Sequence, residues 1–173
     1  MKIRLDDIPE TGRQITLGDA AWFPEGDWER VGPVAGELVV TRQGRRATVA
    51  GRLAFAVRLA CDCCLEPFVY RHDGDCRLNF EFLPPGDPYW TAVDHQCPES
   101  ELEVVALSEP EIDLGEALSQ QVILLLPVKR LCVESCQGLC PVCGGNLNLS
   151  ACACRDQQSA SPFTVLAGLK NKQ

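Results

Sequence analysis

The sequence predicts an α+β protein, in which a curved antiparallel β-sheet or partial barrel is joined by a packing helix and a C-terminal cysteine-rich segment suited to zinc. Apolar residues alternate along much of the stretch from residue 36 to residue 83, and this period of two is typical of half-buried strands. Apolar residues recur at helical spacing from residue 112 to residue 126. Six of the eleven cysteines fall between Leu131 and Arg155.

The first half of the chain predicts an N-terminal arm followed by four strands. Residues 1–30 carry apolar anchors such as Trp22 without a clear period, so we expect an irregular arm. The Arg42-Gln43-Gly44-Arg45 stretch suits a hairpin turn, and Gly51 is a candidate bulge within the second strand. The four strands are expected, in order, over Glu37–Thr41, over Arg46–Leu59, after Pro67, and over Arg77–Leu83.

The clearest helix signal lies between Ile112 and Leu126. Asp113 can cap the helix, with Glu116 three residues later, and Pro127 ends it. We expect a helix near 114–126 that packs on the sheet.

The chain is therefore expected to contain two parts. An α+β domain covers residues 1–130, and the zinc-binding segment with its C-terminal tail covers residues 131–173 and packs on the same domain. The loop from Pro84 to about Ser100 is expected to be mobile, and the tail from Pro162 to Lys170 to form one or two helical turns.

The cysteine-rich segment carries the strongest chemical signal. Cys140-Pro-Val-Cys143-Gly144 is a two-ligand knuckle, in which two intervening residues let both sulfurs face one ion. Because the ligand types are thiolates without histidine, a structural zinc is expected rather than a catalytic one. We expect Cys140 and Cys143 to be ligands, with two more from the remaining members of the cluster, and the candidate ligands are Cys132, Cys136, Cys140, Cys143, Cys152 and Cys154.

Several alternatives stay open for the cysteines. Disulfides would require an oxidising compartment, and four thiolates also suit iron. A second two-ligand spacing, Cys61-x2-Cys64, suits zinc or structural thiols better than a redox pair, because it follows a strand instead of opening a helix. These two thiols and the six C-terminal ones make eight, enough for two four-thiolate sites. Cys76 and Cys97 look like isolated thiols.

Charge and hydropathy limit the partners. The net charge of −8 argues against a body that binds phosphates over its whole surface, and ten acids with no Lys or Arg lie between Glu81 and Val128. No apolar run spans a membrane, and the N-terminus has neither a secretory nor a transit signal, so a cytoplasmic location is expected. Direct RNA contact would use a local group of arginines: Arg42, Arg45, Arg46, Arg52 and Arg58.

No catalytic motif is found. His72 and His95 stand in charged or loop settings and are expected at the surface. Asp73 beside His72 does not make a dyad, because neighbouring strand residues point to opposite faces. There is no phosphate-binding glycine loop and no sign of a small-molecule substrate, so the chain is expected not to be an enzyme.

Two cysteine motifs together resemble the YceD family of large ribosomal RNA subunit accumulation proteins. They are LACDCCLEPF from Leu59 to Phe68 and CQGLCPVCGGNLN from Cys136 to Asn148. The opening MKIRLDDIPE and the apolar stretch from Pro162 to Leu169 are also similar to that family. The family's first motif usually has arginine where Cys63 stands here, which removes a basic side chain and adds a thiol.

The resemblance implies a non-enzymatic bacterial factor that supports 23S rRNA accumulation during large-subunit assembly. Its expected partners are large-subunit rRNA or ribosomal proteins. The alternative is an acidic, zinc-stabilised adaptor that holds a basic ribosomal protein without touching RNA. A redox protein that uses Cys61 and Cys64 is the third hypothesis.

Overall fold

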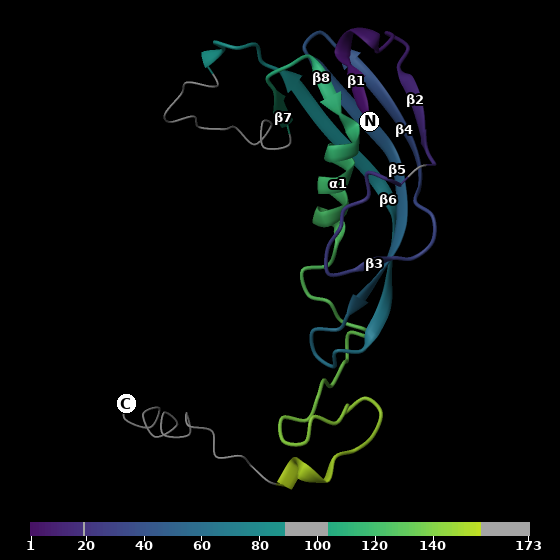
Figure 1. Cartoon of the computed structure of the whole chain (residues 1–173), viewed down its shortest axis with the longest axis vertical. Coiled ribbons are helices and arrows are strands. Elements are labelled where there is room, and N and C mark those ends of the chain that lie inside the picture. Colours follow the sequence, from purple (N-terminus) through teal and green to yellow (C-terminus); the bar gives the residue numbers. More distant parts are fainter. Residues whose placement is uncertain (19, 89–103, 157–173) are drawn as a thin grey trace. The chain divides into compact units, whose positions relative to one another are not determined.

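The computed structural model describes residues 1–18, 20–88 and 104–156, which form two compact units (Figure 1). Among the described residues, unit 1 falls within the ranges 1–59 and 69–128, and unit 2 comprises residues 60–68 and 129–156. The loop at 60–68 therefore belongs with the C-terminal segment instead of with the rest of the expected domain at 1–130. The expected mobile loop and the helical tail lie mainly or wholly outside the described residues, as do His95 and Cys97.

Six strands form the main sheet. Its order is β2-β4-β5-β6-β7, and the short β3 pairs with β5 off this path, so β2, β3 and β7 each have one neighbour among the described residues. The α+β class is confirmed, and of the two expected forms the structure has an open sheet. The strands are β2 (Arg13–Leu17), β3 (Glu29–Arg30), β4 (Ala35–Gln43), β5 (Arg46–Ala60), β6 (Pro67–Phe82) and β7 (Val104–Leu107).

The hairpin of β4 and β5 confirms the predicted turn. Gln43 pairs with Arg46, and Gly44 between them adopts a φ of 62°, which glycine tolerates at no steric cost. The predicted bulge at Gly51 is wrong, because the pairing of Leu38 with Gly51 continues the register on both sides. Glycine is needed there for another reason: a Cβ atom would collide with the carbonyl oxygen of Glu37.

The third and fourth predicted strands are one strand, β6. Exposure alternates along it through the charged stretch at residues 71–75, so the polar residues lie within a strand instead of interrupting it. The sheet is also not wholly antiparallel, because β7 runs parallel to β6, with Asn79 opposite Val104. Parallel neighbours cannot be joined by a tight hairpin turn, so β6 and β7 do not form a hairpin.

The N-terminal arm is more regular than its sequence predicts. It contributes β2 and β3 to the main sheet, and β1 (Lys2–Arg4) pairs with β8 (Glu111–Asp113) in a separate two-stranded sheet. These strands have two to five residues each, which is too short for an alternating pattern to be recognised in the sequence.

The predicted helix is confirmed as α1 (Leu114–Leu125). The Asp113 carboxylate accepts a hydrogen bond of 3.1 Å from the Glu116 N–H, and the helix buries Leu114, Leu118 and Val122 completely. The hydroxyl of Tyr70 in β6 donates to the carbonyl of Leu125 at 3.0 Å. No helix in the described part of the chain is long and apolar enough to cross a membrane.

We predict that Asp113→Ala lowers the free energy of unfolding by about 1 kcal/mol at pH 7, because the first turn of α1 loses its cap. Asp113→Asn is the matched control and keeps most of that stability. The backbone hydrogen bond from Glu116 lowers the pKa of Asp113, so the cap contributes fully above about pH 4 and is lost as the pH falls through the lower folded-state pKa. Urea unfolding of the full chain measures the difference. Equal stability of the wild type and Asp113→Ala at pH 7 would contradict this account.

Candidate metal centres

Unit 2 has no apolar core among its described residues. No aliphatic or aromatic side chain is buried there, and the buried residues are Cys61, Cys64, Gly138 and Cys140. Regular structure is equally sparse, with the short 3₁₀ helix η4 (Ala153–Asp156) and an isolated bridge between Leu139 and Asn146. Units with so small a core usually need a disulfide, a metal ion or a partner to stay folded. The thiols of unit 2 are therefore the groups whose arrangement must be explained.

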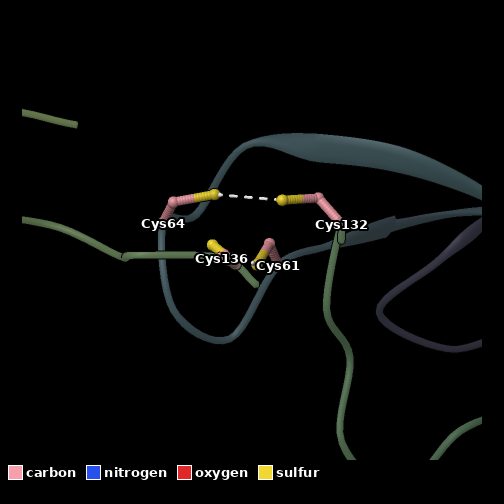
Figure 2. Close-up of side chains that lie close together, drawn as sticks. All are labelled: Cys61, Cys64, Cys132 and Cys136. Atoms are coloured by element: carbon pink, nitrogen blue, oxygen red, sulfur yellow. Dashed lines mark hydrogen bonds between the residues drawn. The ribbon is translucent and has the colours of Figure 1, made fainter. Parts of the chain in front are cut away.

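Four thiols meet where the loop between β5 and β6 faces the segment after α1, and we call them tetrad 1: Cys61, Cys64, Cys132 and Cys136 (Figure 2). All four sulfur atoms lie within 4.8 Å of one another. The Cys61 and Cys136 sulfurs are 3.7 Å apart, and those of Cys64 and Cys132 are 3.6 Å apart. Figure 2 shows the side chains converging from two separate pieces of chain.

A second group, tetrad 2, consists of Cys140, Cys143, Cys152 and Cys154. All four come from one stretch of sequence, and Cys154 lies on η4. The Cys143 and Cys152 sulfurs are 3.3 Å apart, and those of Cys152 and Cys140 are 3.5 Å apart. Cys140 is buried, whereas Cys143 is exposed, so this group lies closer to solvent than tetrad 1.

The sulfur spacing fits a tetrahedral metal. Zinc–sulfur bonds of about 2.3 Å in a tetrahedron place the sulfurs about 3.8 Å apart, close to the separations in both tetrads. A disulfide would need about 2.05 Å, and the described cysteines are all free thiols. A group of four thiolates without histidine or carboxylate is also the donor set of structural zinc sites.

Hydrogen bonds from nitrogen prepare several sulfurs to carry negative charge. The Val142 N–H donates to the Cys140 sulfur at 3.4 Å, and the Cys154 N–H donates to the Cys152 sulfur at 3.3 Å. The side-chain amide of Asn148 donates to Cys136 at 3.4 Å. Donors placed at a sulfur favour its thiolate form, which is the form that binds metals.

The thiol pKa values diverge within the tetrads. Burial opposes the ionisation of Cys61, but backbone N–H groups, chiefly that of Cys132, lower its pKa to about 6. Backbone N–H groups of Cys143 and Val142 lower the pKa of Cys140 to about 7. By contrast, burial together with the neighbouring thiols raises the pKa of Cys132 to about 12. One thiolate forms readily and further ones are resisted, so four thiolates require a cation among them.

The structure divides the six predicted ligands between the two groups. Cys140, Cys143, Cys152 and Cys154 lie together, whereas Cys132 and Cys136 join Cys61 and Cys64. The eight thiols counted in the sequence are therefore placed as two sets of four. The sequence contained the signal, because the eight cysteines occur as four close pairs. It did not show which pairs meet, because that depends on how the loop at 60–68 lies against the C-terminal segment.

The remaining side chains singled out in the sequence lie elsewhere. Cys76 is buried in β6, and Cys63 is half-buried but belongs to neither tetrad. The surface position expected for His72 is wrong, because its ring stacks on Phe55 with centroids 5.2 Å apart and is half-buried. Asp73 pairs with Arg52 at 2.6 Å instead of with His72.

Comparison with known proteins places the chain in a family. The family described as large ribosomal RNA subunit accumulation protein YceD matches residues 49–170, which include all eight thiols of the two tetrads. The chain belongs to the YceD family. It is also 36% identical over 59 residues to "Large ribosomal RNA subunit accumulation protein YCED homolog 1, chloroplastic" from Zea mays. That match covers 32% of this chain and 20% of the maize protein. No solved structure matches the chain.

We predict that a thiophilic divalent ion such as Cd²⁺ protects the eight tetrad thiols of the reduced chain from iodoacetamide, because bound thiolates are not free nucleophiles. Cys63 serves as the internal control. It is half-buried and close to tetrad 1 in sequence, yet should be alkylated with or without the ion. Peptide mass spectrometry measures the modification at each cysteine. Protection of Cys63 together with labelling of Cys136 would contradict the grouping.

Proposed function

We propose that the chain is a non-enzymatic factor that supports 23S rRNA accumulation during assembly of the large ribosomal subunit. Membership of the YceD family carries this proposal, and the name of the maize relative agrees with it. The reducing cytoplasm is the compartment in which eight clustered cysteines remain thiols available to a metal. Cysteine-only ligand sets leave no open coordination position for a substrate, which supports a role without catalysis.

Zinc is the structural cofactor in this proposal, held by tetrad 2. Its donor set, its sulfur separations and the N–H groups at Cys140 and Cys152 all suit a closed four-thiolate site. The ion would supply the attraction that holds the backbone from Cys140 to Cys154 in place of an apolar core. The residues around it position the thiolates and shield part of the charge, and no chemical step is needed there.

The five arginines singled out for RNA contact are each matched with a carboxylate in unit 1. Arg52 lies 2.6 Å from Asp73, and Arg46 lies 3.0 Å from Glu81. The other three pairs are Arg42 with Asp6 at 2.8 Å, Arg58 with Glu29 at 2.7 Å, and Arg45 with Asp87 at 3.9 Å. A phosphate would have to compete with these carboxylates for the guanidinium groups.

This pairing favours action through a basic protein of the large subunit over direct contact with the rRNA backbone. The chain has a net charge of −8, so a positively charged partner is attracted to it and a polyanion is repelled. On this account the factor supports rRNA accumulation indirectly, by delivering or stabilising a protein that the rRNA needs.

We predict that the double variant Arg46→Gln with Arg52→Gln leaves the 23S to 16S rRNA ratio of complemented cells unchanged, because these guanidinium groups are already matched by carboxylates. The charge-preserving pair Arg46→Lys with Arg52→Lys is the control. Retention of a 23S rRNA fragment by the purified variants is measured over a range of salt. Direct phosphate contact predicts instead weaker retention for the glutamine pair alone, with a salt slope lower by about two. An unchanged rRNA ratio in cells that lack the factor would contradict the proposed role itself.

A further inference from the structure

We propose that tetrad 1 is a second four-thiolate zinc site, built from the loop between β5 and β6 and the segment after α1, so that the chain holds two zinc ions. The proposal concerns this chain's own thiols and does not rest on the ribosomal role. Four observations support it: a repeated backbone motif, a strained residue, contacts that bring the two pieces of chain together, and the burial of the thiols.

The loop at 61–66 repeats the backbone hydrogen bonding of the zinc knuckle in tetrad 2. In the knuckle, the Gly144 N–H donates to the Cys140 carbonyl at 2.9 Å, and the Cys140 N–H donates to the Gly145 carbonyl at 2.8 Å. In the loop, the Leu65 N–H donates to the Cys61 carbonyl at 2.9 Å, and the Cys61 N–H donates to the Glu66 carbonyl at 3.0 Å. Donor and acceptor are four and five residues apart in both, so Cys61-x2-Cys64 is folded as a knuckle.

The backbone conformation of Leu65 shows that other interactions hold this loop in shape, because leucine strongly prefers a negative φ. Its φ is 62°, which makes it the one non-glycine residue with positive φ among the described residues, and Gly144 occupies the corresponding position of the other knuckle with a φ of 71°. A left-handed conformation is unfavourable for leucine and persists where surrounding interactions impose it, as at ligand-binding loops. The Leu65 side chain is 65% exposed, so its own burial does not compensate for the strain.

The partner segment is placed beside the knuckle by contacts that do not involve sulfur. The Asp62 N–H donates to the Arg130 carbonyl at 2.7 Å, and the Arg130 N–H donates to the Asp62 carboxylate at 2.7 Å. At Gly138, whose φ is 74°, an added Cβ would lie 3.0 Å from the Cys63 carbonyl oxygen, so the two backbones are in close contact. These contacts hold the segment that carries Cys132 and Cys136 beside the knuckle.

Burial distinguishes a metal site from a reversible redox pair. Cys61 is 0% exposed and Cys64 is 3% exposed, so an external disulfide or thiol partner cannot reach them easily. In addition, each of these two thiols contacts a thiol of the C-terminal segment: the Cys61 and Cys136 sulfurs are 3.7 Å apart, and the Cys64 and Cys132 sulfurs are 3.6 Å apart. Zinc bound here would link pieces of chain that are separated by all of β6 and α1.

Native mass spectrometry of the full, reduced chain tests the proposal. We expect two zinc ions in the wild type. The double variant Cys61→Ser with Cys64→Ser should lose the ion of tetrad 1 and keep one zinc. The double variant Cys143→Ser with Cys152→Ser should lose the ion of tetrad 2 and also keep one zinc. The matched control is Cys63→Ser, which removes a thiol from the same loop and should keep both ions. One zinc in the wild type, unchanged by replacing Cys61 and Cys64, would overturn the proposal. Disulfides within tetrad 1 that persist in protein purified in the presence of a thiol reductant would also overturn it.

Because a variant of tetrad 1 can fail to fold, a titration of the unaltered chain provides an independent measurement. Metal-free protein is titrated with Co²⁺, and the absorption of tetrahedral cobalt thiolate is followed. We expect the absorption to saturate at two equivalents per chain, and saturation at one equivalent would overturn the second site. Iron with visible absorption in the protein as purified would contradict zinc as its resident ion. None of these readouts depends on rRNA, so failure here is distinct from failure of the proposed function.

Discussion

The burial of thiols in place of apolar side chains is the constraint on which unit 2 depends. A chain segment that buries three cysteines and a glycine, and no aliphatic or aromatic side chain among its described residues, gains little from the hydrophobic effect. Thiols gathered within 4.8 Å of one another provide little stability as neutral groups, and they repel one another as thiolates. A cation bound tetrahedrally by the four thiolates would attract all of them and offset their mutual repulsion. Because the unfolded chain has no such site, the free energy of metal binding would then stabilise the folded unit.

Unit 1, by contrast, is stabilised by the burial of apolar side chains. Its strands and α1 bury aliphatic residues such as Leu53, Val57 and Leu118 completely. Its charged groups form exposed ion pairs that contribute little to stability. The two units should therefore respond differently to their conditions: chelation acts on the thiol-based unit, whereas mutations in the core act on the sheet and helix. For the proposed function, this arrangement gives an acidic unit 1 whose arginines are matched by carboxylates and a small unit 2 built around two groups of four thiols.

Sequence patterns predicted the elements whose signals are local. The α1 helix carries its own cap at Asp113 and its own apolar spacing, and the hairpin at Gly44 carries its own turn residue. The patterns failed where a neighbour decides the outcome. Two strands were expected on either side of residues 71–75, but β6 runs through them without a break. The short strand β3 pairs with the much longer β5, and β1 pairs with β8, which is equally short and comes from the far end of unit 1 in sequence.

The tetrads show the same division between local and distant information. The knuckle at Cys140 was recognisable because spacing and glycine lie within five residues. The knuckle at Cys61 was harder to recognise, because Leu65 stands where the other knuckle has Gly144 and shows its left-handed φ only in the structure. The assignment of Cys132 and Cys136 to that loop required the contact between Asp62 and Arg130, which lie far apart in the sequence.

Zinc K-edge absorption spectroscopy of the purified chain tests the central claim most directly, because it reads the ligands of every bound ion at once. The account predicts four sulfur neighbours per zinc at about 2.3 Å and no nitrogen or oxygen in the first shell. A mixed shell, with water, histidine or carboxylate oxygen replacing one or more sulfurs, would contradict a structure held together by two closed thiolate sites.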